Sequence, residues 1–117
     1  MSKTTRLSLV GLLAVFALSA LFAVLPPRGS GKNVKMGTAQ EHMRFRPATI
    51  RVAVGGAITF FNDSGITHTA VCPRCSFDTG DVLPGMLRVV KITRAGTFSF
   101  FCRYHQAQGM TGTIISP

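Results

Sequence analysis

The residues of this chain whose types and spacing could do chemistry lie near its C-terminus. Cys102 is followed by His105 after two intervening residues and by Met110 after four more. His68 lies upstream, on a predicted strand that follows a turn at Asn62. Two imidazoles, a thiolate and a thioether are the donor set of mononuclear electron-transfer copper, with His2Cys in one plane and Met as a weak axial ligand. The sequence therefore predicts one copper ion per chain, bound by these four side chains.

The donor types explain what such a site could do. Thiolate and thioether sulfur stabilise Cu(I), while imidazole binds both Cu(I) and Cu(II), so the site could pass one electron at a time. A zinc site would be expected to use harder donors or more thiolates, and it would have no use for Met110. A single Met or His on a strand is more often a packing residue. The joint spacing of the four donors is what indicates a metal site.

Short strands separated by turns must position these donors. Residues 49–54 alternate between apolar and polar, and Gly55-Gly56 then turns the chain into a second apolar run, which is a hairpin signal. The sequence shows no helical period after residue 31. Strands are expected at 49–54, 57–62, 67–71, 87–92, 96–102 and 111–115. This spacing predicts an all-β fold, an antiparallel Greek-key sandwich, preceded by one apolar N-terminal helix.

The N-terminal segment differs from the rest of the chain. Residues 1–6 carry two positive charges, residues 7–25 are apolar, and residues 26–31 break the run. As a helix, residues 7–25 would span about 28 Å, close to the hydrocarbon thickness of a bilayer. A cleaved signal peptide normally has a shorter apolar region and a small-x-small cleavage site. We therefore favour a membrane anchor, with a cleaved signal peptide as the alternative, and both export the domain.

The expected organisation is a signal peptide or anchor at 1–25, a linker at 26–33 and a domain at 34–117. The formal net charge of the whole chain is +9, and residues after Ser30 include ten basic and four acidic side chains. The basic residues are scattered singly, without a basic run, which argues against nucleic acid as a partner. An acidic protein partner or an anionic membrane surface fits better. The alternative is that the charge serves only to keep the domain soluble.

The exported part resembles the cupredoxins, in particular the plastocyanin, amicyanin and pseudoazurin branch. The motifs that carry the resemblance are Phe45-Arg-Pro47, Ile50-Arg-Val52, Gly56-Ala-Ile-Thr-Phe60, Asn62, His68-Thr-Ala70, Phe77-Asp-Thr-Gly80, Pro84-Gly85, Ala95-Gly-Thr-Phe98, Cys102-x-x-His105 and Gly109-Met-Thr-Gly112. The resemblance implies that His68, Cys102, His105 and Met110 bind copper. It also implies that His105 lies near the surface as an electron port and that Asn62 supports the ligands.

Three positions depart from the pattern of the family. Many members have Asn directly after the first ligand His, where this chain has Thr69, so the hydrogen bond that supports the copper loop is expected to differ. Many have Pro just before the second ligand His, where this chain has Tyr104. Arg103, next to Cys102, adds positive charge and is expected to raise the reduction potential by favouring Cu(I). Plant-type acidic docking patches are absent from the sequence, so the partner is expected to be acidic.

A second pair of cysteines, Cys72-Pro-Arg-Cys75, lies outside this pattern. In an exported chain a loop disulfide is the favoured interpretation, and a second thiolate metal site is the alternative. A thioredoxin-like redox pair would need a helix N-terminus in a βαβ setting, which this chain lacks. Met36, His42 and Met43 are expected to be edge-strand side chains, with a second copper-handling patch as the alternative.

These observations favour a one-electron carrier, expected to be a monomer in the periplasm or on the outer face of the cytoplasmic membrane. Copper trafficking outside the cytoplasm is the alternative, since the extra Cys pair and His42 with Met43 could exchange metal. An enzyme is not expected, because the sequence offers no second metal centre and only about 87 residues remain for the domain. The predicted partner is a redox protein, with the membrane as a further contact through the N-terminal segment.

Overall fold

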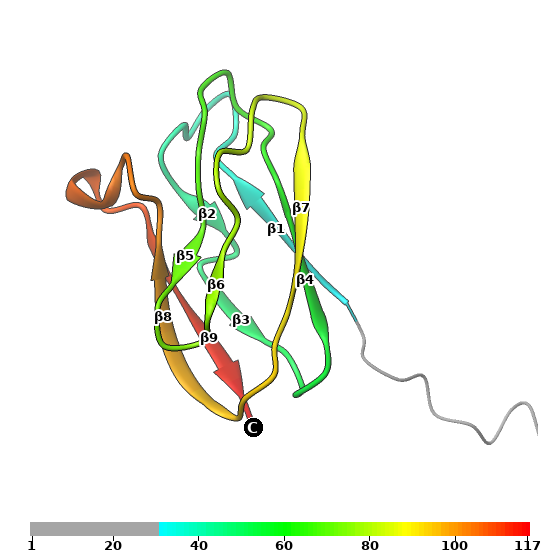
Figure 1. Cartoon of the computed structure of the whole chain (residues 1–117). Coiled ribbons are helices and arrows are strands. Elements are labelled where there is room, and N and C mark those ends of the chain that lie inside the picture. The colour runs from blue at the N-terminus through cyan, green and yellow to red at the C-terminus, as the bar shows by residue number, and fades with distance from the viewer. Residues whose placement is uncertain (1–30) are drawn as a thin grey trace, which may run out of the picture.

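A computed structural model describes residues 31–117, which form a β-sandwich of nine strands (Figure 1). The strands are β1 Lys32–Met36, β2 Phe45–Arg46, β3 Thr49–Arg51, β4 Ala57–Phe61, β5 Val71–Cys72, β6 Phe77–Asp78, β7 Leu87–Lys91, β8 Gly96–Phe101 and β9 Thr111–Ser116. One short 3-10 helix, η1 Gln106–Gln108, lies between β8 and β9. The all-β sandwich that the spacing of the turns predicted is therefore confirmed.

The two sheets are mixed, whereas an antiparallel sandwich was predicted. One sheet has the order β2-β1-β4-β7 and the other the order β3-β9-β8-β5-β6. The pairs β1/β4 and β3/β9 are parallel, and the remaining pairs are antiparallel. The prediction was wrong because the chain changes sheets after β2, so that β1 and β4 become neighbours without a hairpin between them.

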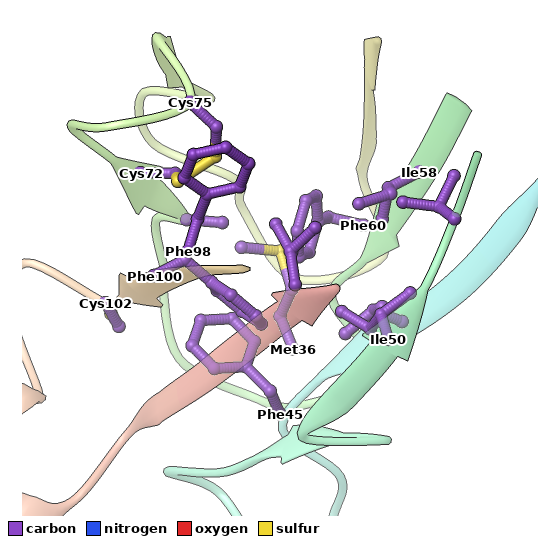
Figure 2. Packing of buried hydrophobic residues seen from close by; sticks show 14 of the residues in the cluster. Met36, Phe45, Ile50, Ile58, Phe60, Cys72, Cys75, Phe98, Phe100 and Cys102 are labelled. Carbon is purple, nitrogen blue, oxygen red and sulfur yellow. A yellow bond between two sulfur atoms is a disulfide. The ribbon is translucent and has the colours of Figure 1, made fainter. Parts of the chain in front are cut away.

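Alternation of side chains along the strands builds the core. In β4, Ile58 and Phe60 are fully buried while their neighbours are partly exposed. Phe60 packs edge-on against Phe45 and Phe100, with ring centroids 6.1 and 5.7 Å apart, in the cluster that Figure 2 shows. Each such ring contributes about 2–3 kcal/mol by leaving water. Aromatic burial at the centre of the sandwich therefore fixes how the two sheets face each other.

Several expected elements differ in detail. Residues 67–71 were predicted as a strand, but only an isolated bridge between His68 and Val82 forms there, and β5 begins at Val71. The strand does not start earlier because the backbone N–H of Ala70 donates to the hydroxyl of Thr79 instead of to a neighbouring strand. β1, β2 and β6 were not among the predicted ranges, and β1 begins at Lys32, within the stretch expected to be linker.

Met36 was expected to be an edge-strand side chain, and this was wrong. It is fully buried, because β1 lies between β2 and β4 and is an inner strand. His42 and Met43 are exposed in the loop between β1 and β2. The predicted N-terminal helix, signal peptide or anchor lies outside the described residues. Among residues 31–117, no helix is both long enough and apolar enough to span a bilayer.

Candidate metal centre

Strand alternation carries Cys102 and Met110 to the same end of the sandwich. Phe98, Phe100 and Cys102 are buried at every second position, so the thiol continues the inward face of β8. Met110, directly before β9, is fully buried as well. The backbone N–H of Cys102 donates to the carbonyl of Met110 over 3.0 Å, which closes the loop that carries His105. Cys102, His105 and Met110 are therefore close in the sequence because they lie in one closed loop between β8 and β9.

Three donor atoms meet at this end of the fold. The Nδ1 atoms of His68 and His105 lie 3.8 and 3.5 Å from Cys102 Sγ, and all three donor atoms lie within 4.8 Å of one another. Metal–nitrogen bonds of about 2.0 Å and metal–sulfur bonds of about 2.3 Å that open at about 120° would separate N from S by about 3.7 Å. The two N–S distances therefore match those expected for a thiolate and two imidazoles around one metal ion.

Thr69 contacts both the thiol and the loop that follows it. Its backbone N–H points at Cys102 Sγ over 3.4 Å, and its hydroxyl oxygen accepts the backbone N–H of Arg103 over 2.8 Å. A donor directed at sulfur stabilises the thiolate, which is the form that binds metal. Thr69 is also fully buried. The hydroxyl thus holds the backbone next to Cys102 at the position where many relatives were expected to use Asn.

A buried hydrogen-bond chain holds the His68 ring on its far side. Ser64 Oγ lies 3.0 Å from His68 Nε2. The hydroxyl hydrogen has acceptors in Asn62 Oδ1 at 2.8 Å and the carbonyl of Ile66 at 3.1 Å, so its oxygen is free to accept the Nε2–H of His68. This assigns the proton to Nε2 and leaves the lone pair of Nδ1 directed at Cys102. The chain therefore selects the tautomer that can bind metal.

Asn62 anchors this arrangement. Its amide nitrogen donates to the carbonyls of Ile66 at 2.7 Å and Val82 at 2.8 Å, and its Oδ1 accepts the backbone N–H of Ser64 at 3.0 Å. The resemblance to the family predicted that Asn62 supports the ligands, whereas Ser64 was not predicted from the sequence. The Asn-x-Ser turn pattern was the available signal, since Asn side chains commonly bond backbone groups two residues on.

Gly37 is a second residue at the site that was not predicted from the sequence. It has a φ of +77°, and a Cβ atom there would lie only 2.9 Å from His68 Nε2 and 2.3 Å from the carbonyl oxygen of His42. The loop between β1 and β2 therefore packs directly against the ligand ring, and only glycine allows this approach.

Burial is the main cause that lowers the pKa of His68 to about 4; the nearby His105 lowers it further, and a hydrogen bond to the backbone of His42 opposes the shift. The ring is therefore neutral at pH 7, which is the form that coordinates metal. His105 is partly exposed, in contrast to His68, Cys102 and Met110.

Two side chains fasten the ligand loop to the segment after β5. The Tyr104 hydroxyl donates to Asp81 over 2.5 Å, and this carboxylate raises the pKa of Tyr104. Arg103 forms an ion pair with Asp78. The positive charge next to Cys102 thus has an acidic neighbour, which the sequence did not indicate.

Cys72 and Cys75 form a disulfide across the turn between β5 and β6, with their Cα atoms 5.4 Å apart. Both residues are buried, and Figure 2 shows the sulfur atoms beside Phe98 in the core. Among the described residues, Cys102 is the free cysteine. The structure therefore separates the two kinds of cysteine, one pair in the core and one thiol among the imidazoles.

The comparisons with known proteins agree with this geometry. The family model described as copper binding proteins of the plastocyanin/azurin family matches residues 32–116. The chain belongs to this family. The cupredoxin resemblance is thereby confirmed, and with it copper as the metal that the donor set fits.

Named plastocyanins are among the similar proteins. Plastocyanin of Lactuca sativa is 33% identical over 95 residues, covering 70% of this chain and 96% of that protein. Chloroplastic plastocyanin of Tetradesmus obliquus is 32% identical over 94 residues, covering 71% of this chain and 65% of that protein. The oxidised plastocyanin of Dryopteris crassirhizoma superposes with a TM-score of 0.64 at 25% identity, over 73% of this chain and 99% of that one.

Proposed function

We propose that this plastocyanin-like chain binds one copper ion through His68, Cys102, His105 and Met110 and carries single electrons between extracytoplasmic redox partners. The observation that carries the proposal is the convergence of two imidazole Nδ1 atoms on Cys102 Sγ, at 3.8 and 3.5 Å. Bound copper supplies the Cu(I)/Cu(II) couple. The chain supplies a fixed set of donors, because Ser64 accepts a hydrogen bond from His68 and the backbone N–H of Thr69 donates to Cys102.

Electrons are proposed to enter and leave at His105, the one residue of the four that is not fully buried. Exposed apolar side chains lie at the same end of the molecule, on the segments next to the ligands. They are Met43, Ile66, Leu83 and Tyr104, exposed by 37%, 37%, 52% and 50%. An apolar surface around a partly exposed ligand allows brief contact with a partner without a permanent interface.

The partner is proposed to present an acidic surface. Arg44 and Arg88 lie in the half of the domain that holds the ligands, and neither belongs to an ion pair of residues 31–117. Arg44→Gln with Arg88→Gln is expected to slow electron exchange with an acidic partner and to flatten its salt dependence. Equal rates in the variant and the parent protein would contradict the acidic surface alone.

Three observations favour the carrier over copper trafficking or over an enzyme. The ligands are largely buried, which slows metal exchange, and Cys72 and Cys75 are joined in a disulfide and cannot hand over metal. The site offers a donor set without a second metal centre among the described residues. The N-terminal segment is proposed to anchor the domain outside the cytoplasm or to be cleaved, and the N-terminus of the mature protein distinguishes the two.

The visible spectrum of copper-loaded protein tests the proposal. An intense blue thiolate-to-Cu(II) band that disappears on reduction and returns on oxidation is expected. Cys102→Ser should abolish the band, whereas His42→Gln, a matched exposed histidine outside the donor cluster, should leave it unchanged. A colourless protein that binds only Cu(I) would contradict the carrier and support trafficking.

A further inference from the structure

Charge is divided along the long axis of the sandwich. One end, which we call the copper end, holds the donor cluster and the loops next to it. The opposite end holds five exposed basic side chains, which we call the basic pole: Lys32, Arg51, Arg74, Lys91 and Arg94. The strands between the two ends are short, and six residues of β8 span about 20 Å.

The strand register places the residues of the basic pole far from the donor cluster. Cys102 follows the last residue of β8, and the first residue of β8, Gly96, pairs with Ser116 at the far end. Arg51 pairs with Ile115 beside it.

Ala57, at the start of β4, pairs with Lys91, and its neighbour Ile58 pairs with Lys32. The Arg94 guanidinium donates to the carbonyl of Arg74 at 3.4 Å, so these two residues are neighbours. The strand register and this contact therefore place all five basic residues at one end of the sandwich, which is at the bottom of Figure 1.

All four acidic side chains lie in the other half, where each has a partner. Glu41 pairs with Arg46, Asp63 with Lys35 and Asp78 with Arg103, while Asp81 accepts from Tyr104. The copper half therefore carries five basic and four acidic side chains and is nearly neutral. The basic pole carries no acidic side chain.

The basic pole is also where residues 1–30 join the domain. Gly31 lies against Ala57, because a Cβ atom built at Gly31 would be 3.9 Å from the carbonyl oxygen of Ala57. The preceding residues include the apolar run from Leu7 to Leu25, which contains no charged side chain. Val54, in the turn between β3 and β4, is 48% exposed and adds an apolar side chain to this end.

We propose that the basic pole docks on an anionic phospholipid bilayer and holds the copper end away from it. Basic side chains next to an anionic leaflet are attracted by its surface potential, and an exposed apolar side chain can enter the interface. The proposal rests on the anchor proposed above, since an apolar run in the bilayer would bring the pole attached to it to the lipid surface. An acidic protein bound at this pole would lie about 20 Å from the copper, with the bulk of the domain between them.

A tryptophan probe tests the contact in the full chain, which contains no Trp. Val54→Trp places the probe at the basic pole, and Leu83→Trp, at a similarly exposed position of the copper end, is the control. Each protein is incorporated into vesicles of phosphatidylcholine alone or mixed with phosphatidylglycerol, with a nitroxide quencher on the lipid headgroups. Quenching of the Val54→Trp protein is expected only with the anionic lipid and should weaken at high salt, while the Leu83→Trp protein stays unquenched.

Charge reversal provides the second arm. Lys91→Glu in the Val54→Trp protein should lower the ratio of docked to undocked domain by about thirtyfold, since two units of charge change beside the lipid. Arg44→Glu changes the net charge equally at the copper end and should leave the ratio unchanged.

Equal quenching of the Val54→Trp protein in both kinds of vesicle, or equal effects of the two reversals, would overturn the proposal. Tryptophan fluorescence reports the contact with lipid whether or not the protein holds copper or is blue. A colourless protein would therefore refute the electron carrier and leave this test intact.

Discussion

The lowered pKa of His68 makes the stability of the copper-free protein depend on pH. The folded-state pKa is about 4, below the value of about 6.5 expected in the unfolded chain. Between these values the unfolded chain binds more protons than the folded one. The stability that comes from keeping the ring neutral is therefore present above pH 6.5 and is lost as the pH falls toward 4.

The size of the effect follows from the separation of the two pKa values. A shift from 6.5 to about 4 corresponds to about 3 kcal/mol once both states are fully protonated. Between pH 7.5 and pH 5, where most carboxylates remain ionised, the His68 contribution falls by about 2 kcal/mol. Since His68 is fully buried, solvent screening reduces this figure little.

Urea denaturation of the copper-free protein, without oxygen, at pH 7.5 and pH 5 measures the change. The midpoint should fall by roughly 1–2 M urea. His68→Gln removes the titrating group and retains a side chain that can bond Ser64, so its stability should change much less over the same range. If parent and variant lose the same free energy between the two pH values, burial of a neutral ring is not the cause and the reasoning fails.

Three further perturbations probe the site. Met110→Gln exchanges a soft thioether for a hard amide and should lower the midpoint potential while leaving the blue band in place; an unchanged potential would argue against an axial sulfur. Arg103→Gln should lower the potential by no more than about 40 mV, since its charge is exposed and paired with Asp78, and Asp78→Asn should raise it; an unchanged or higher midpoint in Arg103→Gln would contradict this. Thr69→Val leaves the backbone N–H of Arg103 without its acceptor and should cost about 1–3 kcal/mol of unfolding free energy, which Thr69→Ser should restore.

Sequence alone could locate the ligands that depend on local geometry. Cys102, His105 and Met110 lie in one loop between two strands, so their spacing along the chain is also their spacing in space. His68 was identified because its residue type completes a donor set, together with the motifs around it. The apolar runs between turns likewise indicated β4, β7, β8 and β9 within a residue or two, whereas the strand predicted at 49–54 ends at Arg51.

Contacts between distant segments could not be read in the same way. The parallel pairings of β1 with β4 and of β3 with β9 join segments without a shared hairpin, so no turn signal marks them. Gly37 contacts the His68 ring across a loop, and an isolated glycine in a sequence is equally consistent with an ordinary turn. The ion pair of Arg103 with Asp78 brings together residues 25 positions apart, which sequence spacing does not indicate.

The positions of the donor cluster and the basic pole suggest why a small domain can carry both. The contacts that Ser64, Thr69 and Gly37 make with the ligands all come from the copper end. The basic side chains share none of these contacts and lie about a strand length away. Substitutions at well-separated sites without common partners act independently. The charge at the far end can therefore change to suit a membrane surface without moving the donors, and the ligand loop can change to suit a redox partner without moving the far end.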